Sequence, residues 1–199
     1  MRRLLPLACL FVLTGCFVDT TGLSATSSAT PHPATAANAG VTIVEFGDLE
    51  CPACKSVELQ IVEPLIAKYG QQIRFEYKHF PIQSAHRYAY EAAQAAECAA
   101  DQGKYWDWIN WNYEHQEELP NNPFKEWAAH FNFDPDLFDR CLRSGIKEDV
   151  VDANYKEGIN LGVDSTPTFF VNGQKVVIQD ATTLDKAVAD ALAKVGAKL

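Results

Sequence analysis

Two cysteines separated by two residues, Cys51 and Cys54, are the side chains of this chain best suited to chemistry. They follow the apolar segment 41–46 and open a stretch with helical periodicity, so a strand is predicted to deliver Cys51 to the start of a helix. Unpaired backbone N–H groups and the helix dipole stabilise an anion there. In such motifs the cysteine pKa falls from about 8.5 to between about 3.5 and 7.5. We therefore predict that Cys51 is a reactive thiolate capable of thiol–disulfide exchange.

The N-terminus has the pattern of an export signal. Arg2 and Arg3 precede an apolar run that is too short to span a bilayer stably. The run ends at Leu13-Thr14-Gly15-Cys16, which resembles the cleavage and lipidation site of bacterial lipoproteins. An ordinary signal peptide with a coincidental cysteine is the alternative. We predict a lipoprotein signal peptide over 1–15, lipidation of Cys16, and an extracytoplasmic protein held on a membrane by acyl chains, in the periplasm or on the outer face of the cell membrane.

Composition separates a tether from a globular domain. Residues 17–40 are rich in Ser, Thr, Ala, Pro and Gly and lack apolar periodicity, so we expect a flexible tether over 16–40 and one domain over 41–199. Loss of Arg2 and Arg3 with the signal peptide takes the formal charge from −9 to −11. With no basic cluster in the rest of the chain, this acidic composition argues against nucleic-acid binding.

Periodicity in the domain predicts an α/β fold interrupted by helices. A strand over 41–46, a helix to about Lys68 with a kink or break at Pro64, and a strand over 73–78 form a βαβ unit. Residues from about 84 to 163 are almost wholly helical, and they form the predicted insertion. Helices are expected there over 84–102, 104–116 and 147–161, with two more beginning at Pro123 and Asp134. Strands over 168–171 and 175–178, joined at Asn172-Gly173, and a helix over 183–195 complete a ββα unit.

This arrangement resembles the DsbA-like form of the thioredoxin fold over about residues 41–195. The resemblance depends on Val44-Glu45-Phe46 before the cysteine motif, on the helical insertion, and on the segment Ser165 to Gly173. It implies that Cys51 is the exposed nucleophile and Cys54 the buried resolving thiol. It also implies that Thr166 and Pro167 form a cis-proline loop against the motif, from which the Thr166 backbone pairs with substrate.

The resemblance also implies roles for charged residues. Glu45 matches a buried acid below the cysteines that relays a proton to Cys54 through water, and it shares a strand face with Ile43. A rim position on an edge strand is the alternative for Glu45. Glu58 matches a second acidic position, and Lys78 is a candidate counter-charge. Ala53 departs from the family pattern, because the strongest oxidants carry His there, so the helix dipole must supply most of the thiolate stabilisation.

The remaining charges and cysteines have simpler interpretations. Asp48 and Glu50 are expected to be solvated loop charges that raise the pKa of Cys51 slightly. Cys9 lies in the signal peptide, which leaves Cys98 and Cys141. Two such cysteines outside the cytosol usually pair, so we predict a structural disulfide; two free buried thiols are the alternative.

These features predict an extracytoplasmic enzyme, a thiol–disulfide oxidoreductase that introduces disulfides into exported proteins. Its partners would be cysteine-containing exported proteins and a membrane redox partner that reoxidises the cysteine motif. A monomer with no cofactor and no metal is expected. One alternative is a disulfide reductase or isomerase, which Thr166 also suits. The other is a copper-binding assembly protein using both cysteines and a distant histidine, although no histidine follows His130.

Overall fold

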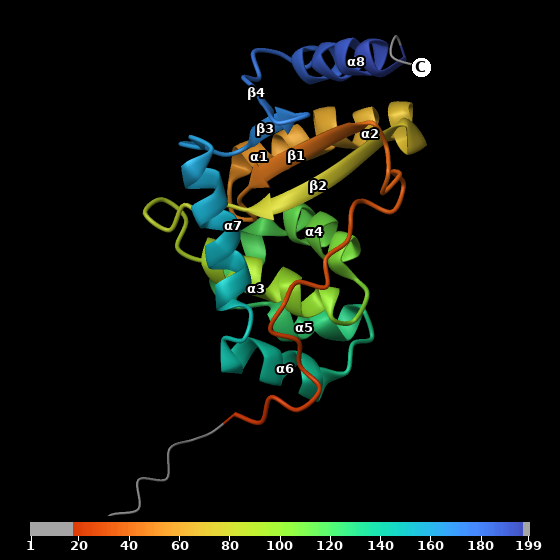
Figure 1. Cartoon of the computed structure of the whole chain (residues 1–199). Coiled ribbons are helices and arrows are strands. Elements are labelled where there is room, and N and C mark those ends of the chain that lie inside the picture. Colours follow the sequence, from red (N-terminus) through yellow and green to blue (C-terminus); the bar gives the residue numbers. More distant parts are fainter. Residues whose placement is uncertain (1–17, 197–199) are drawn as a thin grey trace, which may run out of the picture.

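Four strands form the central sheet of the molecule. The computed structural model describes residues 18–196, and in this range the strand order is β2-β1-β3-β4 (Figure 1). The strands are β1 (Val41–Gly47), β2 (Ile73–His79), β3 (Thr168–Val171) and β4 (Gln174–Val176). β1 pairs in parallel with β2 and antiparallel with β3, which pairs antiparallel with β4. This mixed sheet, built from a βαβ half and a ββα half, confirms the predicted fold class.

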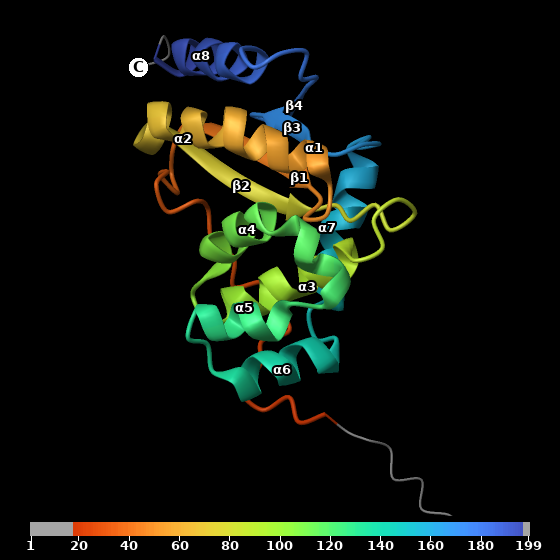
Figure 2. The same cartoon turned by 180° about the vertical axis from the view of Figure 1, so that it is seen from behind.

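The helix that follows Cys51 is broken where a kink was predicted. It consists of α1 (Pro52–Val57), a π-helical turn (Glu58–Val62) and α2 (Glu63–Tyr69). Pro64 lies in the first turn of α2 and has no N–H to donate to the π-helical turn before it. The wider π-helical turn comes immediately before it, so the helix changes geometry without losing its direction along the sheet (Figure 2).

The helical insertion occupies the end of the molecule opposite α8 (Figures 1 and 2). Its helices are α3 (Ala89–Ala100), α4 (Tyr105–Glu114), α5 (Phe124–His130), α6 (Pro135–Ser144) and α7 (Glu148–Asn160). Asp134 caps α6 as expected, because its carboxylate accepts hydrogen bonds from the N–H groups of Asp136 and Leu137, both at 3.0 Å. The main apolar core runs without interruption from the sheet and α2 into this insertion.

The predicted start of the first insertion helix at residue 84 is wrong, because α3 begins at Ala89. Two side chains from the loop before Cys51 account for the delay. Asp48 accepts a hydrogen bond from the Ile82 N–H at 2.8 Å, and Glu50 accepts one from the Tyr88 N–H at 2.5 Å. These bonds hold residues 80–88 as a loop of turns against the cysteine motif, although their sequence has helical periodicity.

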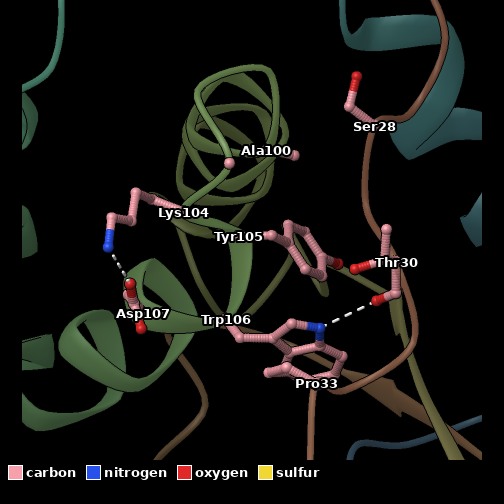
Figure 3. A pocket seen from close by; sticks show the side chains of 9 residues that line it. Ser28, Thr30, Pro33, Ala100, Lys104, Tyr105, Trp106 and Asp107 are labelled. Carbon is pink, nitrogen blue, oxygen red and sulfur yellow. Dashed lines mark hydrogen bonds and ion pairs between the residues drawn. The ribbon is translucent and has the colours of Figure 1, made fainter. Parts of the chain in front are cut away.

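The flexible tether predicted over 16–40 is wrong for the residues that the structure describes. Residues 18–40, here called the N-terminal strap, run from beside α6 along the insertion to β1 (Figure 1). Lys147 donates to the Thr26 carbonyl at 2.8 Å, and Trp106 donates to the Thr30 carbonyl at 2.9 Å. A pocket lies between the strap and the start of α4, where the Trp106 indole reaches across to Thr30 (Figure 3).

The strap also covers the outer edge of the sheet. The His32 N–H donates to the Phe75 carbonyl and the Ala36 N–H donates to the Ile73 carbonyl, both at 2.9 Å. β2 is an edge strand, and its unpaired backbone groups need partners. The composition of residues 18–40 predicted disorder because it describes this segment alone. The edge of β2, to which the segment binds, exists only after the sheet has formed.

The C-terminal half closes the fold with a hairpin and a helix. Asn172 and Gly173 both have positive φ, 48° and 77°, as a tight turn between β3 and β4 requires. β4 ends at Val176, two residues before the predicted end. The last helix, α8 (Thr183–Gly196), packs against β1, β3 and β4.

Two predictions concern the N-terminal end of the chain. The signal peptide over 1–15 and the lipidation site Cys16 lie outside the described residues. From residue 18 to residue 196, no helix combines the length and the apolar character needed to cross a bilayer.

Candidate active site

Cys51 occupies the position where the loop after β1 becomes α1. It is the N-cap residue of that helix, and Pro52 supplies the first helical position. The sequence predicted an exposed Cys51, but its exposed fraction is only 6%, because residues of the loop before β3 lie over it; Cys54, one turn further on, has 0%. The Cys51 Sγ lies 3.6 Å from the backbone oxygen of Thr166, and both cysteines carry free thiols. A small exposed area of the residue therefore distinguishes Cys51 from Cys54.

The two thiols have similar burial but opposite shifts in pKa. A hydrogen bond from the Cys54 thiol lowers the pKa of Cys51 to about 5, against the opposing effect of burial and with further help from the Cys54 N–H and the Thr166 side chain. Burial raises the pKa of Cys54 far above its usual range, and the Cys51 sulfur and the Glu45 carboxylate add to this. At neutral pH Cys51 is thus the thiolate and Cys54 the thiol.

The loop that faces Cys51 has the expected proline geometry. The peptide bond between Thr166 and Pro167 is cis. The Thr168 hydroxyl donates to the Ser165 carbonyl at 2.7 Å and fixes the turn before β3. The loop thereby places the Thr166 backbone oxygen beside the Cys51 sulfur, and its Pro167 has no N–H to compete for backbone partners.

Two acidic side chains lie buried beneath the cysteines. Glu45 on β1 is fully buried, which excludes the alternative rim position, and Glu58 comes from the π-helical turn. Both oxygens of Glu45 and one of Glu58 lack a hydrogen-bond partner. Burial raises the pKa of Glu45 well above its usual range, with added repulsion from Glu58 and Cys51, and burial likewise raises that of Glu58. These acids therefore hold protons at pH values where ordinary carboxyls have lost them.

Two tyrosines complete this buried cluster, and sequence reasoning missed both. Tyr77 stands opposite Glu45 on the neighbouring strand, and its hydroxyl lies 2.8 Å from that of Tyr113 on α4. Burial raises the pKa of Tyr77, as do the charges of Cys54 and Glu45. Strand register was the only available signal for Tyr77, since residues 41 and 73 begin paired strands of equal length.

Lys78 was predicted as a counter-charge for these acids, and this prediction is wrong. It lies next to Tyr77 in β2 and therefore points to the opposite face of the sheet. Its ammonium group pairs with the Glu157 carboxylate of α7 at 2.9 Å. A lysine ammonium beside Glu45 and Glu58 would lower the pKa of these acids, so the position of Lys78 on the other face leaves their raised pKa values intact.

Asp48 and Glu50 were expected to be solvated, and this is wrong for Asp48, whereas Glu50 is half-buried. The Asp48 carboxylate is buried and accepts from the Glu50 N–H, the Ile82 N–H and the His86 imidazole, each at 2.8 Å. The Glu50 carboxylate accepts from the Tyr88 N–H. Both acids thus join the cysteine loop to residues 80–88. This places His86 near the cysteine motif, a neighbour that sequence spacing could not predict.

A family model described as Thioredoxin matches residues 28–190 of this sequence. The chain belongs to the thioredoxin family. The match begins inside the N-terminal strap, in agreement with the packing of that segment on the domain.

Solved structures with this fold support the DsbA-like form of the family. A thioredoxin-like oxidoreductase from Silicibacter pomeroyi shares 24% identity, with 82% of this chain and 92% of that chain covered and a TM-score of 0.71. The α-DsbA1 of Wolbachia pipientis shares 19% identity, with 87% and 99% covered and a TM-score of 0.73. The fold of this thioredoxin-family protein is therefore that of DsbA structures with a helical insertion.

Curated relatives of this thioredoxin-family chain have much longer sequences. One is named Na(+)/H(+) antiporter NhaA 1, from Salinispora arenicola, and is 39% identical over 142 residues, which are 69% of this chain and 21% of that protein. A second, from Mycolicibacterium gilvum, is 33% identical over 145 residues and 22% of its length is covered. The chain thus spans about a fifth of the length of the curated relatives it matches.

The second cysteine pair of this thioredoxin-family domain lies away from the motif. Cys98 on α3 and Cys141 on α6 form a disulfide, with their Cα atoms 5.9 Å apart. Both are buried in the apolar core of the insertion. The structure thus pairs the two cysteines that the motif leaves over.

Proposed function

We propose that this protein is an extracytoplasmic thiol–disulfide oxidoreductase that introduces disulfides into exported proteins through Cys51 and Cys54. The observation that carries the proposal is the opposite acidity of two adjacent thiols, with the pKa of Cys51 lowered to about 5 and that of Cys54 raised. A stabilised thiolate favours the reduced form of the motif, and that makes its disulfide oxidising. Solved structures of the same fold include a protein titled as a thiol–disulfide oxidoreductase.

The reaction consists of two exchange steps. A substrate thiolate attacks the Cys51 sulfur of the Cys51–Cys54 disulfide; an S–S bond forms to the substrate, and Cys54 leaves with the electron pair and takes up a proton. The second substrate thiolate then attacks the substrate sulfur of this mixed disulfide, and Cys51 leaves as a thiolate. The substrate dithiol is oxidised by two electrons and the enzyme motif is reduced. The low pKa of Cys51 speeds its departure, because sulfurs of low pKa are better leaving groups.

The buried acids supply the proton that Cys54 needs. Glu45 is protonated over a wide pH range and lies close enough to Cys54 to influence its acidity. Proton transfer from a carboxyl to the departing sulfur, directly or through water, avoids a buried thiolate at Cys54. Thr166 has a different role, in substrate binding, since its backbone offers the substrate main chain a hydrogen-bond partner beside Cys51.

Location and recycling complete the proposal. The pattern ending at Cys16 supports export and a lipid anchor on a membrane, where a redox partner would accept two electrons from the reduced motif. The Cys98–Cys141 bond supports a compartment in which disulfides persist. Detergent partition and mass measurement of the mature protein test the anchor, because Cys16→Ala should then release the protein or leave it unprocessed.

The decisive test of direction is the reduction potential of the motif in glutathione buffers, combined with oxidation of a reduced cysteine-containing protein. A potential near about −120 mV and rapid substrate oxidation support the oxidase, whereas one near about −270 mV assigns the protein as a reductase. Cys51→Ser should lose all turnover, and Cys54→Ser should accumulate mixed disulfides at Cys51. Cys98→Ala with Cys141→Ala is the matched control and should retain turnover.

A further inference from the structure

Asp48 is a buried carboxylate only three residues before Cys51. Its side chain has no exposed surface, and its backbone oxygen accepts a hydrogen bond from the Cys51 N–H at 3.1 Å. A buried carboxylate is costly unless hydrogen bonds and an opposite charge compensate it. An uncompensated charge at this position would also disfavour the Cys51 thiolate, because like charges raise the pKa of an acidic group.

His86 supplies the compensation. Its Nδ1 lies 2.8 Å from Asp48 Oδ2. In residues 18–196, His86 is the basic side chain that forms an ion pair with Asp48. The imidazole side chain is 19% exposed, so it can exchange protons with solvent. No basic residue stands in the motif Cys51-Pro52-Ala53-Cys54 itself.

Three acidic groups act on His86. These are Asp48, to which it is bonded, Glu50, whose carboxylate is fixed on the Tyr88 N–H, and the Cys51 sulfur. Partial burial opposes the charged imidazole, but the hydrogen bond from His86 to Asp48 and the charges of these three groups raise the pKa of His86. The coupling is reciprocal: a thiolate at Cys51 favours the proton on His86, and the proton on His86 favours the thiolate.

We propose that His86 is a positioning residue for the exchange reaction: as an imidazolium on Asp48 it fixes the loop before Cys51, cancels the Asp48 charge and favours the Cys51 thiolate. Residues 80–88, which lie outside the motif, thereby tune its reactivity. The proposal rests on the exchange chemistry proposed for Cys51 and does not depend on the direction of electron flow.

The test is the ultraviolet absorbance of the Cys51 thiolate, titrated in the reduced full-length protein. His86→Asn keeps a hydrogen-bond donor for Asp48 but removes the positive charge, and the Cys51 pKa should rise by about half to one unit. Adding Asp48→Asn to His86→Asn removes both charges and should return the pKa to within about 0.3 unit of the wild-type value. His130→Asn, at an exposed histidine stacked on Trp111 at the end of α5, is the matched control and should leave the titration unchanged.

A Cys51 titration that does not move in His86→Asn would overturn the proposal, as would a double variant with a larger shift than the single one. Because either variant could unfold the loop, the wild-type protein provides a second measurement. NMR titration of its His86 ring should give a higher pKa in the reduced protein than in the oxidised one, where the thiolate is absent. Equal values in both states also reject the proposal. These titrations measure only the pKa values of Cys51 and His86. They therefore test the role of His86 even if the protein proves not to be an oxidase.

Discussion

The two cysteine pairs of this molecule contain the same atoms and have opposite surroundings. Cys51 and Cys54 are thiols at the start of a helix, where Cys51 keeps a small exposed fraction, a loop faces it, and buried acids lie beneath the pair. Cys98 and Cys141 are bonded to each other between α3 and α6, inside an apolar core.

The comparison shows that surroundings decide whether a cysteine pair reacts or stabilises. A helix start and neighbouring hydrogen bonds favour the thiolate of Cys51, and exchange requires that species. The interior position of Cys98 and Cys141 excludes attacking thiolates and offers a thiolate no stabilisation. A mild reductant should therefore open the Cys51–Cys54 bond of the oxidised protein and leave the other bond intact.

The largest expected effect comes from removing the disulfide of the insertion. Cys98→Ala with Cys141→Ala opens a loop with a sequence separation of 43 residues. The unfolded-chain estimate for such a loop is about 4 kcal/mol, and the melting temperature should fall by about 5–15 °C. Calorimetry on the variant and the wild type measures the loss. The Cys51 titration should not change, and a shift there would mean that the two pairs are coupled.

The next largest effect is the pH dependence of stability that comes from the buried acids beneath Cys51 and Cys54. Within residues 18–196, the disulfide pair Cys98–Cys141 has no acid of raised pKa beside it. Burial raises the pKa of Glu45 and Glu58 in the folded state above that of the unfolded chain. Folding therefore binds protons, so the stability that these groups contribute is fully present below about pH 4.3 and is lost as pH rises through their folded pKa values. Between about pH 4.5 and pH 8 the wild type should lose at least ~1 kcal/mol relative to Glu45→Gln with Glu58→Gln.

Denaturant unfolding of both proteins across this pH range measures the difference. Glu126→Gln is a suitable control, because this glutamate is exposed on α5 and its charge does not act on Glu45 or Glu58. Parallel stability curves for the wild type and the double variant would show that the buried acids are not the source of the pH dependence.

The smallest effect is expected at the loop facing Cys51. Thr166→Val keeps the size of the side chain and removes the hydroxyl that helps to lower the pKa of Cys51. The pKa should rise by less than about one unit, because the Cys54 hydrogen bond and the helix start remain. The thiolate absorbance titration measures this shift. The same substitution at Thr168, whose hydroxyl bonds to Ser165, should leave the titration in place, and an equal shift there would assign the effect to loop distortion.

Local patterns allowed much of the fold and site to be predicted. The alternation around Ile43 and Glu45 predicted the buried face of β1, and Asn172-Gly173 predicted the last hairpin turn, because period and turn chemistry are local properties. The start of α3 and the surroundings of Asp48 could not be predicted in this way. Both depend on hydrogen bonds between residues 48–50 and residues 82–88, which have no sequence signature.

The sequence by itself determined the chemistry of this protein: a cysteine pair at a helix start, two further cysteines in an inserted helical region, and an acid on the buried face of a strand. Each follows from residue type and spacing, which act over a few positions along the chain. Only the tertiary structure decided that the strap covers the edge of β2, that Tyr77 and Tyr113 meet beneath Cys54, and that His86 compensates Asp48. The physical reason is that edge pairing, burial and charge compensation depend on which distant residues the fold brings together.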